Sequence, residues 1–181
     1  GIYINNVGNS ATANLTLSSA SNIDVKNSLN GIGIYTNNTD IGGTGAGTIT
    51  VGQNGVGVYA KNGTTTLNNL TLNLFGNNSV GIYTDGTNSF TGNGTINVDG
   101  TGVIIFNISG TGSFNQNFNI TSTPGSSYAF GNIKNTTIYS NNSTTMGANG
   151  IYINGTNSAV LLGTNSSLTS LDSNVTGLAL N

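Results

Sequence analysis

The chain has 181 residues, of which only 4% are charged, and its formal net charge is −2. This balance excludes an electrostatic footprint for nucleic acid, and the lack of His and Cys removes two common catalytic side chains. No apolar stretch approaches the ~20 residues of a membrane-spanning helix, while the 35% hydrophobic content argues against disorder.

The chain opens with "GIYINN", without an initiator Met or a signal peptide, which predicts a fragment from inside a longer protein. The opening Gly-Ile-Tyr element returns in "GIGIYT" (31–36), "GVGVYA" (55–60) and "VGIYT" (80–84). The Tyr residues of these three copies are equally spaced and define a 24-residue period. The interval from Tyr3 to Tyr35 is longer, so we expect a loop insertion there. A repeat of this period is typical of a solenoid.

Later copies of the element are less regular. "GVIIFN" (102–107) places Phe106 one position short of a full period after Tyr83, and "NGIYIN" (149–154) restores the motif at Tyr152. Either Tyr128 or Phe130 supplies a copy between them.

Two further runs of apolar residues keep the same period. The first has the apolar-polar-apolar form of a half-buried strand and comprises Ile49/Val51, Leu72/Leu74, Ile96/Val98 and Phe118/Ile120. The second is looser and comprises Leu15/Leu17, Thr64/Thr66, Phe90, Ile138 and Val160/Leu162. Each period therefore contains three short strands.

Turn residues separate these strands, because Gly, Asn and Asp suit tight corners. The predicted corners are Asn62-Gly63, Asp85-Gly86, Asn93-Gly94, Asp99-Gly100 and Asn154-Gly155. No segment has helical composition or periodicity. We predict an all-β, right-handed parallel β-helix (β-solenoid) with three strands and about 22–24 residues per coil, in which residues 1–181 form one segment.

The repeat register predicts which side chains enter the core. Ile34, Val58 and Ile82 should point inward in successive coils, as should Val51, Leu74 and Val98. Strict alternation places Ile32 beside Ile34 on the inner side, and therefore turns Tyr35 outward. The same reasoning predicts an outer stripe of Tyr3, Tyr35, Tyr59, Tyr83, Phe106 and Tyr152, with Gly33, Gly57 and Gly81 also facing outward.

Tyr35, Tyr59 and Tyr83 are the candidate ligand-binding residues. Aromatic rings beside bare backbone suit the stacking of sugar rings or the docking of a partner's side chains. The alternative is that the rings only stabilise successive coils. Lys61 and Asp85 stand two residues after consecutive Tyr copies, and form either part of a polar site or a solvated surface pair.

Neither catalysis nor metal binding has a recognisable residue pattern. The ionisable side chains are five Asp and three Lys, and no two Asp have the placement that glycoside hydrolysis needs. "GGTGAG" (42–47) lacks the Asp of calcium-binding repeats. We therefore predict no catalytic residue, no metal site and no cofactor.

The repeats "GIGIYT", "GVGVYA" and "SVGIYT", with their Asn-Gly and Asp-Gly turns, resemble the passenger repeats of large fusobacterial-type autotransporter adhesins, which use type V secretion. The resemblance implies an extracellular rod at the bacterial cell surface or outer membrane. It implies adhesion to host cells or other bacteria through surface glycans or proteins, without nucleic acid as a partner. The membrane would be reached only through a C-terminal barrel outside this chain, and we expect a monomer.

Two alternatives remain open at this point. The chain can be the scaffold of a polysaccharide-active enzyme or phage tailspike whose catalytic coils lie outside these residues. It can also be a pure spacer stalk without a ligand.

Overall fold

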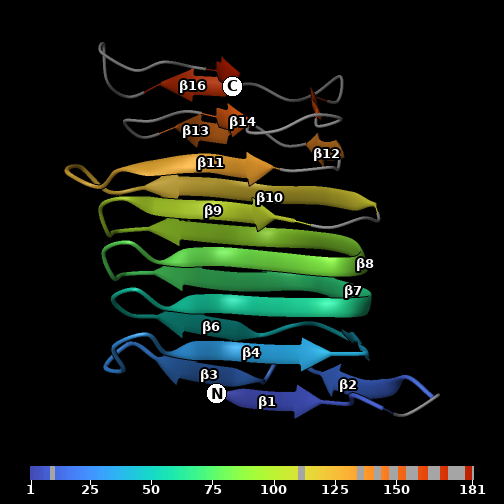
Figure 1. Cartoon of the computed structure of the whole chain (residues 1–181). Helices are drawn as coiled ribbons and strands as arrows, with labels where there is room; N and C mark the ends of the chain where they lie inside the picture. The colour runs from blue at the N-terminus through green and yellow to red at the C-terminus, as the bar shows by residue number, and fades with distance from the viewer. Residues whose placement is uncertain are drawn as a thin grey trace.

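The computed structural model describes residues 1–8, 11–109 and 113–133, and six further strands between residues 137 and 180. Side chains are described for residues 1–8, 11–109, 113–129 and 131. The described elements are all strands, and they stack into a tall coil that rises from the N-terminus to the C-terminus (Figure 1).

The strands form three faces. The first face contains β1 (Ile2–Asn5), β4 (Ile32–Asn37), the beginnings of β7 (Val56–Leu74) and β8 (Val80–Val98), β9 (Val103–Ile108), β11 (Tyr128–Ile133), β14 (Ile151–Ile153) and β17 (Leu178–Leu180). The second contains β2 (Ala13–Leu17), β5 (Thr39–Gly43), the middles of β7 and β8, the beginning of β10 (Phe114–Ser122), β12 (Thr137–Ser140) and β15 (Ala159–Leu162). The third contains β3 (Asn22–Val25), β6 (Thr48–Val51), the ends of β7, β8 and β10, β13 (Thr144–Met146) and β16 (Leu168–Ser170).

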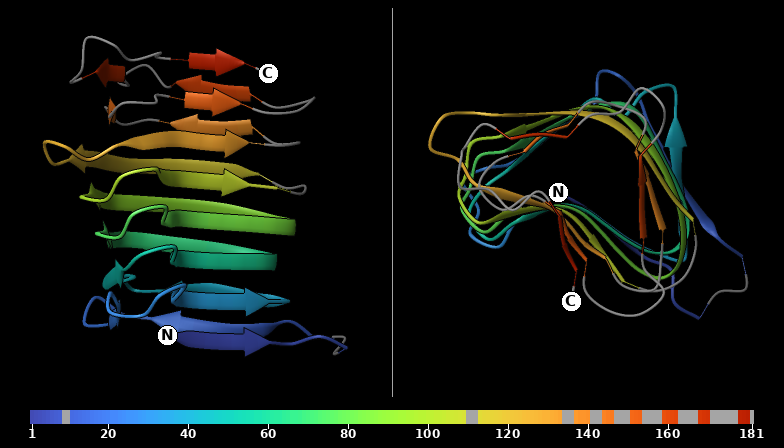
Figure 2. Two further views of the ribbon diagram at one scale, coloured as in Figure 1. Left: turned by 60° about the vertical axis from the view of Figure 1, so that its left-hand side comes forward. Right: turned by 90° about the horizontal axis from the view of Figure 1, so that it is seen from above.

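Every pairing between these strands is parallel and joins one coil to the next. Ile34 pairs with Val58 and Val58 pairs with Ile82, so the period of the sequence is the period of the coil. Seen from above, successive coils follow nearly the same outline (Figure 2). The molecule is the parallel β-solenoid that the repeats predict.

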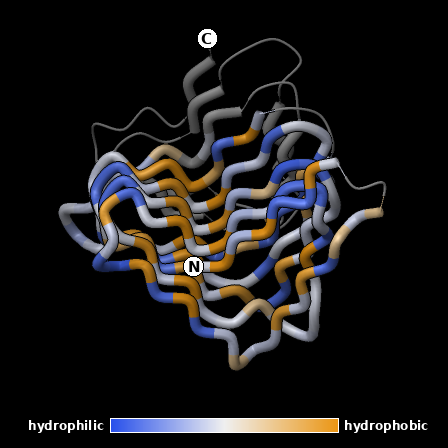
Figure 3. The backbone as a smooth tube through the Cα atoms, turned by 60° about the horizontal axis from the view of Figure 1, so that its bottom comes forward, coloured by the Kyte–Doolittle hydropathy of each residue, from blue (hydrophilic) through white to orange (hydrophobic). Residues whose placement is uncertain are grey.

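The predicted core columns are confirmed. Ile34, Val58 and Ile82 are fully buried, and on the third face Val51, Leu74 and Val98 are buried at successive levels. Figure 3 shows hydrophobic positions repeating from coil to coil along the strands. Because each level buries its residues mainly against the levels next to it, stability is shared between neighbouring coils.

The long first interval is a loop insertion, as predicted. Tyr3 pairs with Tyr35 although more than one full period of chain separates them. The chain between Asn5 and Ala13 runs from residue 6 to residue 12, whereas only Asn38 separates their partners, Asn37 and Thr39. Most of the extra length therefore belongs to the connection between the first two faces.

The described corners contain residues with positive φ. Asn62, Gly63, Gly86 and Gly94 adopt such φ angles, as predicted. Gly100 does not have a positive φ. A Cβ atom added to it would lie 2.3 Å from the carbonyl oxygen of Gly76 in the coil below, so this corner leaves no room for a side chain. The predicted corner at Asn154-Gly155 lies outside the described residues. A column that the sequence reasoning missed has positive φ at Asn30, Asn54, Asn78 and Gly102.

The orientation predicted for the repeat glycines is wrong. Gly33 is buried, and a Cβ added to it would lie 2.7 Å from Cγ2 of Ile49, a core residue on the third face. Gly57 and Gly81 are buried as well, and their added Cβ atoms would meet Leu72 side-chain atoms. Strict alternation fails because the backbone turns both the glycine and the residue after it inward.

The residue before each of these glycines is correspondingly only half-buried, and so is Ile104 at the same position of the next coil. These residues pair from coil to coil as Ile32, Val56, Val80 and Ile104. Ile32 therefore does not share the inner side with Ile34, contrary to the prediction. The four side chains form an aliphatic column along the first face.

Two other register details differ from the sequence prediction. Thr65, rather than Thr64 and Thr66, is the buried Thr of the second face, and it pairs with Ile41 and Phe90. Ile120, rather than Phe118, pairs with Ile96, because the β10 register is shifted by two positions. An even shift preserves the side on which a residue lies, so Phe118 and Ile120 are both still fully buried.

Candidate functional site: a tyrosine stripe and its polar border

Four Tyr residues form a continuous stripe along the first face. Tyr3, Tyr35, Tyr59 and Tyr83 pair in register across consecutive coils. Their ring centroids are separated by 4.7, 5.0 and 4.5 Å in that order. The first pair is stacked, the second is edge-to-face and the third is tilted. These are the contact geometries that aromatic pairs favour.

All four rings lie outside the coil, as the sequence predicts. Tyr3 is 69% exposed, and Tyr35, Tyr59 and Tyr83 are half-buried where neighbouring rings cover them. The stripe therefore presents ring edges and hydroxyl groups to solvent along the length of three coil-to-coil steps.

The stripe stops after Tyr83, and the predicted placement of Phe106 is wrong. Phe106 pairs with Ile82 rather than with Tyr83 and is fully buried. Asn107 takes the outward position after Tyr83. The physical reason is that the register keeps the full period here, so a ring one position short of that period falls on the inner side of the strand.

The later aromatic candidates do not extend the stripe within the described side chains. Tyr128 pairs with Val103 and is fully buried, and the side chain of Phe130 lies outside the described residues. Tyr152 pairs with Asn132, which pairs with Asn107, so its backbone is in the register of the stripe. The side chain of Tyr152 is not among those described.

Burial shifts the proton equilibrium of the central ring. It raises the pKa of the Tyr59 hydroxyl above the usual 10.0, and repulsion from the ionised forms of Tyr83, Asp85 and Tyr35 raises this pKa further. Tyr59 therefore stays protonated, and available as a hydrogen-bond donor, well into the alkaline range.

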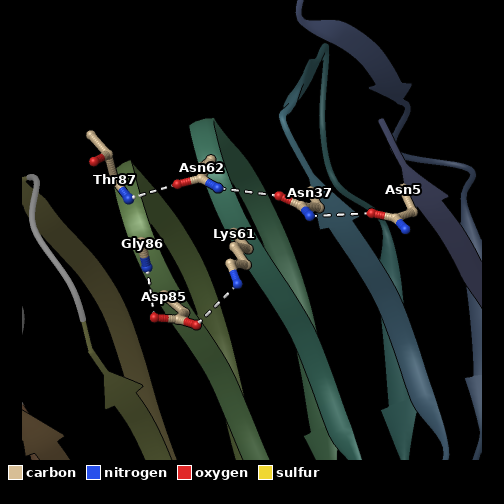
Figure 4. Close-up of polar contacts among 7 residues, drawn as sticks. All are labelled: Asn5, Asn37, Lys61, Asn62, Asp85, Gly86 and Thr87. Atoms are coloured by element: carbon tan, nitrogen blue, oxygen red, sulfur yellow. Dashed lines mark hydrogen bonds and ion pairs between the residues drawn. The ribbon is translucent and has the colours of Figure 1, made fainter. Parts of the chain in front are cut away.

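One border of the stripe contains the predicted charged pair. Lys61 and Asp85 pair in register, and the Lys61 Nζ atom lies 3.8 Å from Asp85 Oδ2 (Figure 4). The two side chains are 39% and 33% exposed, so the pair contributes at most about 1 kcal/mol to stability. The other carboxylate oxygen, Oδ1, accepts a hydrogen bond of 2.7 Å from the Gly86 backbone N–H.

Beside this pair runs an Asn ladder that the sequence reasoning did not identify by residue. The Asn37 side-chain amide donates to Asn5 Oδ1, and the Asn62 amide donates to Asn37 Oδ1, both at 3.2 Å. The Thr87 backbone N–H donates to Asn62 Oδ1 at 2.9 Å (Figure 4). The signal in the sequence is an Asn two positions after Tyr in two of the four copies, and three positions after it in another.

The other border is the aliphatic column of Ile32, Val56, Val80 and Ile104. The sequence reasoning missed it because it assigned Ile32 to the core. The signal that would have revealed it is "GVIIF" in the coil above β8. There Ile105 takes the position that Gly81 has in β8, and it is fully buried. An apolar side chain at the glycine position indicates that this position faces inward and that the residue before it faces outward. The site is therefore a band of tyrosine rings with an aliphatic margin on one side and an amide and charged margin on the other.

The remaining carboxylates of the described part each serve a local structural role. Asp24 accepts a hydrogen bond from the Lys26 N–H, Asp40 from the Thr64 N–H, and Asp99 from the Thr123 hydroxyl. Within residues 1–8, 11–109 and 113–129, no three His, Cys, Asp or Glu residues gather as a metal site would require. The predicted absence of catalysis and cofactors stays a prediction.

Comparisons with known proteins add no relatives. No protein-family model matches the chain, and no match was found among curated proteins or among solved structures. In the part of the chain that the structure describes, no helix is long and apolar enough to span a membrane.

Proposed function

We propose that this chain is a structural and adhesive segment of a bacterial autotransporter adhesin, exposed on the cell surface. The observation that carries the adhesive part is the row of four outward Tyr rings on one β-sheet face. Aromatic side chains that gather outside the core on one face mark sites of recognition.

The geometry of the stripe suits a partner with both apolar and hydroxyl-rich surface. Ring edges contact sugar rings or apolar side chains, and the phenol hydroxyls donate hydrogen bonds. The protonated state of Tyr59 keeps this donor present across the physiological pH range. Lys61, Asp85 and the Asn ladder add polar groups beside the rings. The partners that fit are surface glycans or proteins of host cells or other bacteria.

The bacterial-surface part of the proposal rests on the resemblance of the "GIGIYT"-type repeats to autotransporter passengers. Its test is the location of the protein in cells that produce it in full. Antibodies against this chain should label intact cells, and protease added outside should remove the label. Signal seen only after the cells are permeabilised would contradict it.

The test of the adhesive stripe is a triple variant, Tyr35→Thr, Tyr59→Thr and Tyr83→Thr. Thr retains strand propensity, and the three side chains lie outside the core. Adhesion of beads coated with the chain to host or bacterial cells should be lost, while the β-sheet circular dichroism stays unchanged. The control is Leu29→Ser, which removes an exposed apolar side chain away from the stripe and should leave adhesion intact. Full adhesion by the triple variant would contradict the proposal.

A spacer without a ligand is the second candidate. The short distances of 4.5–5.0 Å between neighbouring ring centroids favour the spacer, because the Tyr rings already pack against one another without a ligand. If the rings only join the coils, beads coated with the parent chain will not adhere to cells, and the triple variant will only lose thermal stability. The third candidate, a scaffold for polysaccharide-active coils or a phage tailspike, predicts that enzyme activity maps to coils outside this chain.

A further inference from the structure

A groove lies on the third face, away from the tyrosine stripe, and has a volume of about 300 Å³. It opens between two outward columns at the ends of β7, β8 and β10. One column contributes Asn73, Asn97 and Thr121, and the other contributes Phe75, Asp99 and Thr123. Its size is at the lower end of the range for small-molecule sites.

The apolar part of the groove is the ring of Phe75. This ring is 38% exposed, whereas the Phe side chains at positions 90, 106, 114 and 118 are buried. Lys26 Nζ, from two coils below, lies 4.4 Å from the ring centroid. The Lys26 ammonium group therefore contacts the side of the ring that points toward the N-terminal coils. The groove lies on the C-terminal side, where the next two coils supply Asn97, Asp99 and Thr123.

The wall of the groove is a ladder of uncharged polar groups. Asn97 Nδ2 donates to Asn73 Oδ1 at 2.8 Å, and the Thr121 hydroxyl donates to Asn97 Oδ1, also at 2.8 Å. Each carboxamide has two N–H donors and two acceptor positions. The ladder fixes the orientation of Asn97 and uses one of its N–H groups, which leaves the second for a ligand.

Asp99 supplies an acceptor at the mouth of the groove. It is exposed, and its Oδ1 accepts a hydrogen bond of 2.5 Å from the Thr123 hydroxyl. No hydrogen bond to Asp99 Oδ2 is found among the described residues. A fixed carboxylate with one open oxygen is a strong acceptor for ligand hydroxyl groups.

These groups together select a chemical class of ligand. An aromatic face matches the apolar C–H face of a sugar ring, and alternating amide donors and carboxylate acceptors match its hydroxyl groups. A sugar acid or a phosphate would meet the negative charge of Asp99, and the nearest described cation, Lys26, lies on the far side of the ring.

We propose that this groove is a binding subsite for one residue of a neutral saccharide, which stacks on Phe75 and donates a hydroxyl hydrogen bond to Asp99. The subsite goes beyond the proposed stripe, because it lies on a different face and uses none of its residues. Its failure and the failure of the stripe are therefore separate results.

The test uses three neutral probes, cellohexaose, chitohexaose and galactohexaose, and one acidic probe, trigalacturonate. Binding to the full chain is measured by isothermal titration calorimetry or by saturation-transfer NMR. We expect at least one neutral probe to bind and trigalacturonate to bind at least about tenfold more weakly. Phe75→Ser should weaken the neutral probe about tenfold or more, which corresponds to about 1.4 kcal/mol.

Asp99→Asn is the second variant, because it preserves shape and removes the strong acceptor. It should weaken the neutral probe and reduce the preference over trigalacturonate. The triple Tyr variant is the control on the other face and should bind as the parent does. Thermal melting of each variant shows that the coil is intact.

Three outcomes would overturn the subsite. They are the absence of binding by all three neutral probes, equal affinity of Phe75→Ser and the parent, and loss of binding in the triple Tyr variant alone. The last result would assign the saccharide to the stripe.

Discussion

The coil that contains β8 and the coil above it, which contains β9 and β10, use aromatic residues in different ways. In the lower coil, Tyr83 lies outside and the glycine Gly81 lies inside. In the upper coil, Asn107 lies outside, and Ile105 and Phe106 fill the interior. The register between the two coils is continuous, so the same backbone accommodates either an outer aromatic ring with an inner glycine or two inner apolar side chains.

The interior of the upper coil is an aromatic cluster. Phe106 lies 5.2 Å from Phe114 and 6.2 Å from Phe118, measured between ring centroids, and Phe114 stacks on Phe90 of the lower coil at 4.4 Å. Glycine in the lower coil makes this possible, because a Cβ at Gly92 would lie 2.7 Å from both the Phe118 and Phe90 rings. The missing side chain of a glycine in the adjacent coil therefore leaves the space that these rings occupy in the core.

A charge placed in the core of the lower coil should destabilise the protein most. Ile82→Asp should destabilise the protein by about 4 kcal/mol or more, because Ile82 is fully buried and the new carboxylate has no partner. Urea unfolding measures the loss. The control is Ser89→Asp, at an exposed position of the same strand, which should change stability by less than about 0.5 kcal/mol. Similar stability of both variants would show that the register is wrong.

The next effect compares an inner ring with an outer one. Phe106→Ala should cost about 3–5 kcal/mol, because it leaves a cavity among packed rings. Tyr83→Ala removes a ring of similar size from the outer stripe and should cost only about 1 kcal/mol. Denaturant midpoints of the two variants give the comparison. Equal losses would mean that the stripe is as important to the fold as the core.

A smaller effect should follow from extending the stripe into the upper coil. Asn107→Tyr places a fifth ring in register above Tyr83, and each aromatic pair is worth about 0.5–1.5 kcal/mol. We therefore expect a melting temperature a few degrees higher. Asn107→Thr is the control, since Thr has good strand propensity without a ring. A gain in the Thr variant equal to that in the Tyr variant would attribute it to propensity.

The smallest effect concerns pH. The pKa of Tyr59 is raised in the folded state, so the unfolded chain loses this proton first as pH rises. The resulting stability is complete below the unfolded pKa of 10.0, and is lost as the pH rises through the folded pKa. At pH values above that unfolded pKa, the melting temperature of Tyr59→Phe should fall less steeply than that of the parent. Tyr3→Phe is the comparison variant. The same alkaline decline in Tyr59→Phe and the parent would refute the assignment.

The sequence alone determined the coil and most of the tyrosine stripe. The equal spacing of Tyr35, Tyr59 and Tyr83 fixes which residues stack, because parallel coils place equal positions directly above one another. The adjacent column of Ile34, Val58 and Ile82 then has to face inward, since one face of each strand must be buried. The pairing of Lys61 with Asp85 follows from the same period.

The residues that fill the interior at each level depend on tertiary packing. Position 33 accommodates glycine because Ile49, on a different face, occupies the space that a Cβ would need. The period along one face carries no information about a neighbour across the core. Phe106 is buried because the register between β8 and β9 keeps the full period, which places Phe106 above Ile82 and not above Tyr83. The groove beside Phe75 likewise joins residues from three coils. Sequence periodicity specifies the stacking direction, whereas packing across the coil depends on volumes that all three faces share.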